Sequence, residues 1–176
     1  FRSTSYSFKK MNSYPIHTKP FGEHAILIEW PNKIERAILD DILIFIEHLK
    51  KTHLKESLWE MVPAYNSLTL INREENINYI AMSEDLISWY KERREVKKKP
   101  SYLWKLPVCY DLEFGIDLEE VAKIKGKSIE QIITLHSSCS YTVYGIGFLP
   151  GFMYLGGVPK ELETPRKAVP RLHVEK

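Results

Sequence analysis

Residues 24–51 read HAILIEWPNKIERAILDDILIFIEHLKK and set the architecture of the first half of the chain. The opening residues 24–30 are apolar, which is typical of a β-strand. Asn32 then has the character of a helix N-cap, with Glu35 as its capping-box partner. Because apolar residues recur at helical spacing after this point, a helix is predicted from Lys33 to about Lys51.

The following residues extend this strand and helix into a larger unit. Short strands are predicted at 58–62 and 67–71, with a tight connection between them. A second amphipathic helix is predicted from Glu75 to about Glu95, and large apolar residues alternate strictly over 102–110, which indicates another strand. The order β-α-β-β-α-β is that of a ferredoxin-like sheet with both helices on one face. The predicted fold class is therefore α+β, with a first domain over 13–105.

A second domain is predicted over 106–176. Asp117 is a predicted N-cap with Glu120 as its box partner, and Ser128 caps a further helix with Gln131 as its partner. Strand-like alternation then returns. The two helices imitate a DNA-binding helix-turn-helix, but the second, SIEQIITLHSS, carries no lysine or arginine to contact phosphate. DNA binding is therefore not expected.

The bulk composition is that of an ordinary soluble globular protein. The 176 residues are 44% hydrophobic and 27% charged, with a net charge of +2. This small charge gives no reason to expect a general binder of nucleic acids or membranes. No apolar run is long enough to span a bilayer. Cys109 and Cys139 do not resemble a disulfide framework, and reduced thiols favour a cytoplasmic location.

Residues 141–173, YTVYGIGFLPGFMYLGGVPKELETPRKAVPRLH, carry the chemistry. Glycines let a backbone approach a ligand closely, prolines fix turns, and aromatic side chains supply pocket walls. Two Pro-Arg pairs follow, Pro165-Arg166 and Pro170-Arg171. An arginine held behind a proline is a pre-organised fork for a carboxylate or phosphate. The composition predicts a rigid, aromatic-lined pocket for a small anion.

These features also have plain structural interpretations. A barrel corner would use Pro150, Gly151 and the residues around Tyr154 equally well, and a corner can also be a pocket wall. His136 follows an apolar helix face, where a core histidine is as good an interpretation as a general base. The histidines show no metal-ligand spacing, so no metal site is expected. Neither a G-x-S-x-G elbow nor a G-x-x-x-x-G-K-[ST] loop is present.

Short motifs are spread from about Tyr14 to the end of the chain. They are Phe21-Gly22-Glu23-His24-Ala25, PAYNSL at 63–68, LPVCY at 106–110, His136, Tyr141, GFLPGFMYLGG at 147–157, and the two Pro-Arg pairs. Together they resemble the family that includes the B-type subunit of 5-oxoprolinase, allophanate hydrolase subunit 1 and KipI-type kinase inhibitors. The family more often has aspartate where Glu23 stands. The run at 147–157 followed by paired Pro-Arg is the specific part of the resemblance.

The resemblance implies that the second domain is the start of a cyclophilin-like β-barrel, which a further glycine-rich segment completes. It implies a subunit of an ATP-dependent 5-oxoprolinase, which opens the lactam of 5-oxoproline to glutamate with A-type and C-type companion subunits. ATP is expected in the complex rather than at a motif of this chain, which alone is expected to be inactive. The implied catalytic residues are His136 and Arg166, and the implied substrate-binding residues are Phe148, Pro150, Gly151, Tyr154 and Arg171.

Two other functions stay open at this point. One is an inhibitory binding protein of a sensor histidine kinase, which would use an exposed surface and need no catalytic residues. The other is an amide hydrolase subunit of the allophanate hydrolase type, which cleaves the same kind of bond in a different substrate.

Overall fold

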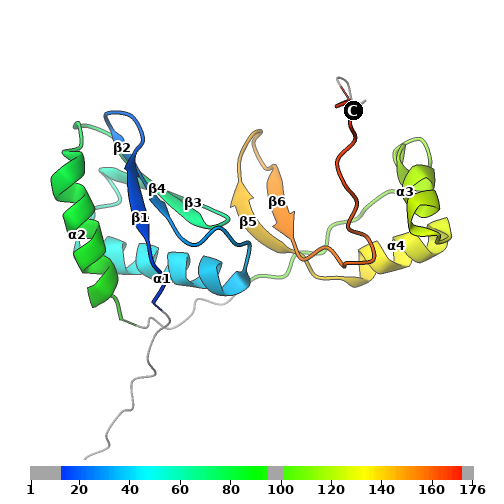
Figure 1. The fold of residues 1–176 in the computed structure, drawn as a ribbon, viewed down its shortest axis with the longest axis horizontal. Helices are drawn as coiled ribbons and strands as arrows, with labels where there is room; N and C mark the ends of the chain where they lie inside the picture. The colour runs from blue at the N-terminus through cyan, green and yellow to red at the C-terminus, as the bar shows by residue number, and fades with distance from the viewer. Residues whose placement is uncertain (1–12, 95–100, 172–176) are drawn as a thin grey trace, which may run out of the picture. The chain divides into compact units, whose positions relative to one another are not determined.

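The computed structural model describes residues 13–94 and 101–171 (Figure 1). The described chain divides into two compact units. The first takes in the described residues up to Ser101 together with Val143–Tyr154, and the second takes in Tyr102–Thr142 and the described residues from Leu155 onward. The ranges 13–105 and 106–176 stay a prediction of the domain organisation. No helix in the described ranges is both long enough and apolar enough to cross a membrane.

The first unit is built on an antiparallel sheet of four strands in the order β1-β2-β4-β3 (Figure 1). The strands are β1 His17–Pro20, β2 Ala25–Glu29, β3 Trp59–Ala64 and β4 Ser67–Asn72. The register sets Ile26 opposite Leu70 and Ile28 opposite Leu68, and all four side chains are fully buried. One face of the central strand pair therefore carries the apolar residues.

Two helices cover this face, α1 Arg36–Thr52 and α2 Tyr79–Glu92 (Figure 1). Phe45 of α1 and Leu86 of α2 lie in the same buried cluster as Ile26 and Leu68 of the sheet. Because successive strand residues point to opposite faces, both helices must pack on the side that carries Ile26. Burial of one large aliphatic side chain stabilises a fold by roughly 1.5–3 kcal/mol, so this cluster is the main source of the unit's stability.

Both helices begin later than their sequence predicts. The N-cap of α1 is Glu35, whose side chain makes no capping hydrogen bond, so the predicted Asn32 cap and its box are wrong. The N-cap of α2 is Asn78, whose side chain accepts a hydrogen bond from the Ala81 amide over 3.3 Å. The predicted start at Glu75 is early, because the Asn72 side chain holds the Glu75 amide in the preceding turn over 3.0 Å.

The predicted strand over 102–110 is wrong, because residues 101–111 form neither helix nor strand. Its place is taken by β1, which pairs antiparallel with β2 at the edge where the last strand of a ferredoxin-like sheet would lie. β1 reads HTKP, and this short polar stretch ending in proline carries no strand signal although it suits a sheet edge. The α+β class is confirmed, with the ferredoxin-like strand order completed from the N-terminal side.

The helices of the second unit are α3 Leu118–Lys125 and α4 Ile129–Ser138. The predicted capping box of α4 is confirmed: Ser128 Oγ accepts from the Gln131 amide over 3.3 Å, and Gln131 Oε1 accepts from the Ser128 amide over 2.9 Å. Asp117 is the N-cap of α3, but its side chain makes no capping hydrogen bond, so the predicted box with Glu120 is wrong. Ala122, Ile132 and Leu162 form a small core.

A hairpin follows α4, as the alternation after Ser140 predicts. Its strands, β5 Thr142–Ile146 and β6 Met153–Gly156, form a separate sheet of two strands. These are the strands that the described residues 101–171 contain. The cyclophilin-like barrel therefore stays an expectation from the resemblance.

Candidate functional site

Four of the predicted substrate-binding residues lie on the β5–β6 hairpin, three of them at its tip. The Gly147 amide donates to the Phe152 carbonyl over 3.0 Å and closes the loop between the strands. Phe148 has a φ of 65° and Gly151 a φ of 80°, so the chain turns through two left-handed conformations there. A Cβ strains that conformation, which explains glycine at 151. Pro150 is exposed at the same tip.

Aromatic rings form a continuous row from this tip to the turn between β3 and β4. Phe148 meets Phe152 edge-on with ring centroids 5.7 Å apart, and Phe152 meets Tyr154 at 5.1 Å. Tyr154 meets Tyr65 at 5.8 Å, and the Tyr65 amide donates to the Tyr144 carbonyl over 3.1 Å. The structure thus places Phe148 and Tyr154 in one aromatic row anchored on the first unit. Their role in ligand binding stays a prediction.

In the second unit, His136 lies in the last turn of α4 and is held from two sides. Its Nδ1 is 2.6 Å from the hydroxyl oxygen of Tyr110. The Tyr141 hydroxyl donates to the His136 carbonyl over 2.9 Å. Burial, with smaller contributions from Cys139 and Tyr110, raises the pKa of Tyr141, so this hydroxyl stays protonated and able to donate. With Nδ1 engaged, Nε2 is the nitrogen suited to exchange a proton with a ligand.

A cavity of about 360 Å³ opens beside His136. Most of its wall is apolar, and its polar side chains are few. An apolar pocket with a small number of convergent polar groups is the common form of a small-ligand site. The lining that matters here comprises Tyr110, Ile116, Asp117, Ile132, His136 and Thr164.

Arg171 forms a bidentate ion pair with Asp117 on the wall of this cavity. Its Nη1 and Nη2 donate to the two carboxylate oxygens over 2.9 and 2.8 Å. Lys167 Nζ lies 2.7 Å from Asp117 and 2.6 Å from Glu120. Arg171 first, and Lys167 second, hold the pKa of Asp117 well below its usual range, so this carboxylate stays ionised. Part of the Arg171 fork is therefore engaged by the protein itself.

Arg166, the other predicted arginine, is exposed and makes no hydrogen bond or ion pair with another side chain in the described part of the chain. His136 thus lines the cavity, and Arg171 lies beside it because it pairs with the lining residue Asp117. Arg166 lies on the same segment as Arg171. Within residues 13–94 and 101–171, no group of three or more His, Cys, Asp or Glu side chains is arranged for a metal ion.

Sequence reasoning missed Tyr110 and Asp117 as members of this site. Tyr110 ends the motif LPVCY, but the motif does not say what its hydroxyl contacts. The Tyr110–His136 contact joins residues 26 positions apart, and Arg171 lies 54 positions from Asp117. Contacts of this kind depend on how α3, α4 and the segments beside them pack, which periodicity does not report.

Comparison with known proteins finds one matching family. The sequence profile of the carboxyltransferase domain, subdomain C and D, matches residues 16–176. The B-type 5-oxoprolinase subunit of Escherichia coli O157:H7 is 39% identical over 153 residues, covering 87% of this chain and 68% of the relative. The B-type 5-oxoprolinase subunit of Bacillus subtilis (strain 168) is 32% identical over 165 residues, covering 85% of this chain and 66% of the relative.

Solved structures give the same picture of the fold. The crystal structure of TTHA0988 superposes with a TM-score of 0.66 at 29% identity, over 84% of this chain and 28% of that one. Urea carboxylase of Kluyveromyces lactis superposes with a TM-score of 0.63 at 17% identity, over 81% of this chain and 14% of that one. At that identity the second likeness concerns the fold alone. The chain spans about two thirds of the length of the curated relatives that it matches.

Proposed function

This chain belongs to the family of the carboxyltransferase domain, subdomain C and D, and we therefore propose that it acts as a subunit of an ATP-dependent 5-oxoprolinase. The reaction opens the lactam of 5-oxoproline to glutamate, and A-type and C-type companion subunits complete the enzyme. The names of its relatives support the substrate. The observation that carries the chemistry is that His136 lines a largely apolar cavity and its ring is held by the Tyr110 hydroxyl.

Opening the lactam requires proton transfer as well as attack on the carbonyl. The oxygen of water joins the carbonyl carbon, the amide C–N bond breaks, and the leaving nitrogen gains a proton. His136 is suited to take a proton from the water and deliver one to the nitrogen, because an imidazole can do both near neutral pH. The Tyr110 hydroxyl lies 2.6 Å from Nδ1 and holds the ring in place, which leaves Nε2 as the nitrogen open to proton exchange.

The carboxylate of 5-oxoproline needs a cationic partner. Arg166 is our first choice, because its guanidinium is exposed and carries no side-chain partner in the described ranges. Arg171 is the second choice, since its donors face Asp117. An arginine fork binds a carboxylate through two parallel N–H bonds, so either residue gives orientation as well as charge. Substrate contacts of Phe148, Pro150, Gly151 and Tyr154 are proposed from the aromatic row of their hairpin.

We assign ATP to a companion subunit rather than to this chain. The tripeptide Gly126-Lys127-Ser128 is the same as the end of a nucleotide phosphate loop, but Gly126 terminates α3, and the Ser128 side chain caps α4. A phosphate loop follows a strand and leaves its backbone amides open to the phosphates. The local structure of this tripeptide therefore favours placing ATP on a companion subunit, and ATP enters no step assigned to these residues.

The experiment that tests this function is ADP release by the full-length protein mixed with its two candidate companion subunits, with and without 5-oxoproline. We expect release only when all subunits and 5-oxoproline are present. The matched control replaces this subunit with its His136→Gln variant, which should fold and assemble but support little turnover. Release that does not depend on this subunit or on 5-oxoproline would contradict the proposal and favour kinase binding or another amide.

A further inference from the structure

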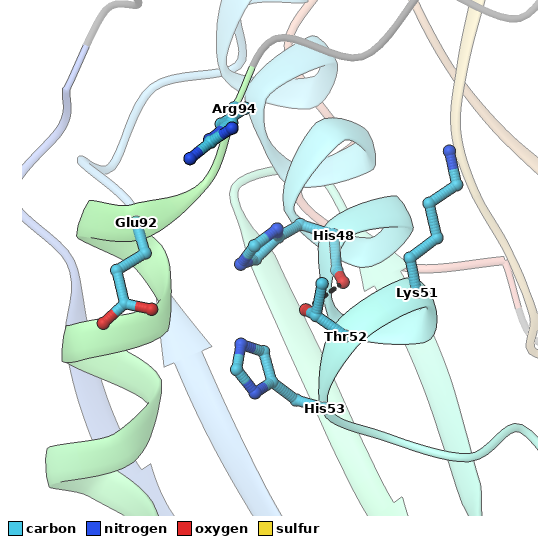
Figure 2. Close-up of a pocket in the computed structure, with 6 residues that line it drawn as sticks. All are labelled: His48, Lys51, Thr52, His53, Glu92 and Arg94. Atoms are coloured by element: carbon cyan, nitrogen blue, oxygen red, sulfur yellow. Dashed lines mark hydrogen bonds between the residues drawn. The ribbon is translucent and has the colours of Figure 1, made fainter.

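A second cavity, of about 660 Å³, lies in the first unit where α1 and α2 end (Figure 2). It takes no part in the function proposed above. The residues that line it are His48, Lys51, Thr52, His53, Glu92 and Arg94. This lining carries two cations, two imidazoles, one hydroxyl and one carboxylate, so groups that can donate hydrogen bonds outnumber the carboxylate.

The key observation is that His48 Nε2 is buried without a hydrogen-bond partner. It is the one such side-chain nitrogen or oxygen among the described residues. Buried polar atoms in folded proteins are nearly always paired with protein, water or a ligand. The His48 ring points from α1 toward the end of α2 (Figure 2), and His48 is one of the residues that line the cavity.

His53 and Arg94 supply further donors beside this nitrogen. The His53 ring stacks on Trp89 with centroids 4.1 Å apart and meets the His48 ring edge-on at 5.4 Å, so it is held in place. Arg94, which follows the end of α2, also lines the cavity (Figure 2). Within the described ranges its guanidinium makes no hydrogen bond or ion pair. Three sets of donors therefore face one space.

The remaining charged groups define what the space accepts. Glu92 is the single acidic side chain of the lining, and it already accepts a hydrogen bond from Ser88 Oγ over 2.9 Å. Lys51 projects away from the imidazoles (Figure 2), so it adds positive charge rather than a direct contact. Among the described residues, the histidines and Glu92 do not form a metal-ligand group. An excess of positive charge and several N–H donors in one lining favour an anion.

We propose that this cavity binds a phosphate group, held by the Arg94 fork, by Nε2 of His48 and by the ring of His53. A guanidinium donates two parallel bonds to two oxygens of a tetrahedral phosphate, and the imidazoles reach a third. Glu92 accepts the proton of a singly protonated phosphate, which a sulfate does not carry. The phosphate comes either as the free inorganic ion or as a monoester.

The test follows the imidazole signals of His48 and His53 by NMR during a titration of the full-length protein with inorganic phosphate. Ionic strength is held constant with chloride, because loose association with surface charges is screened by salt. We expect saturable shifts of both rings. Arg94→Gln should weaken binding by roughly tenfold or more, since it removes a charge-assisted pair of bonds. Lys91→Gln, an exposed cation of the same helix outside the cavity, should leave binding unchanged.

Parallel titrations distinguish the source of the phosphate. Glycerol 3-phosphate binding tighter than inorganic phosphate supports a monoester, and the reverse order supports the free ion. Sulfate binding as tightly as phosphate would overturn the proposal, as would shifts that do not saturate. An equal loss of affinity in Arg94→Gln and Lys91→Gln would also overturn it. Unchanged thermal unfolding of both variants would show that a loss of affinity does not come from misfolding.

Discussion

Arg93 donates through Nη2 to Asp41 Oδ1 over 2.7 Å, and the two side chains are only 4% and 6% exposed. This ion pair links Arg93, which follows α2, to Asp41 near the beginning of α1. Asp41 Oδ2 also accepts from Trp30 Nε1 over 2.7 Å and from the Tyr90 hydroxyl over 2.6 Å. The Arg93 guanidinium lies 3.4 Å from the centroid of the Tyr90 ring. Burial and the bond to Asp41 raise the pKa of Tyr90, so it remains a donor at all ordinary pH values.

Asp41→Asn is expected to lower the free energy of unfolding by about 3 kcal/mol, because it leaves the buried Arg93 charge without its counter-charge. Urea denaturation measures this loss. The matched control is Glu60→Gln in β3, whose carboxylate pairs with Arg73 over 3.7 Å, with both side chains about half exposed. An exposed pair of this kind is worth about 0.5 kcal/mol. Equal effects of the two substitutions would show that the buried network does not stabilise the unit.

Under the proposed function, Tyr110→Phe is expected to lower kcat of the complex by about tenfold to a hundredfold with little change in KM, because His136 loses the hydroxyl that orients it. Tyr102→Phe is the control, because Tyr102 is 80% exposed in the same segment. A normal kcat for Tyr110→Phe would remove Tyr110 from the site.

Under the proposed function, Arg166→Ala is expected to lower kcat/KM of the complex by about a hundredfold, because the guanidinium that binds the substrate carboxylate is lost. Lys160→Ala removes an exposed cation from the same part of the chain and should have little effect. Steady-state ADP release at several 5-oxoproline concentrations separates the two constants. An unchanged kcat/KM would transfer the role to Arg171, which is bound to Asp117 in this structure.

Gly151→Ala is expected to cost about 1 kcal/mol of stability in the hairpin, because its φ of 80° strains any residue with a Cβ. A steric clash is not the reason, since a Cβ at Gly151 would meet no atom within 4 Å. Gly147→Ala is the control, because its Cβ would make only an ordinary contact with the Tyr154 ring at 3.9 Å. Hydrogen exchange of the Phe152 amide, which lies in the closed loop, reports the effect locally. Equal exchange in the two variants would contradict the strain.

The stability of the first unit is expected to fall as the pH drops below about 6.5, the ordinary value for histidine. Burial, followed by His53, lowers the pKa of His48. Glu92 opposes this effect and Arg93 adds to it. Since the unfolded chain then takes up a proton before the folded one, the unfolding free energy decreases between the two pKa values. In His48→Gln this slope should be shallower, measured by denaturation in phosphate-free buffer at several pH values. Parallel curves would exclude His48 as the cause.

Local pattern was sufficient for most of the elements. The apolar run of β2, the helical spacing of α1 and the capping box of Ser128 each depend on residues a few positions apart, and each was confirmed. The alternating residues 102–110 were mispredicted for an instructive reason. Alternation tells which side chains share a face, but a strand also needs a neighbour for its backbone hydrogen bonds, and no pattern within the segment supplies one.

The α+β class, most of the order of helices and strands, and the family all follow from local periodicity and short motifs, so the amino-acid sequence was enough to establish them. Tertiary packing was needed to place β1 at the sheet edge beside β2, to bring Tyr110 to His136, and to pair Asp117 with Arg171. It also left Nε2 of His48 buried without a hydrogen-bond partner. Among the side-chain nitrogen and oxygen atoms of the described residues, no other atom is in this position. Each of these features depends on how elements far apart in the chain pack against one another. Backbone geometry and burial determine that packing, and the local sequence pattern does not.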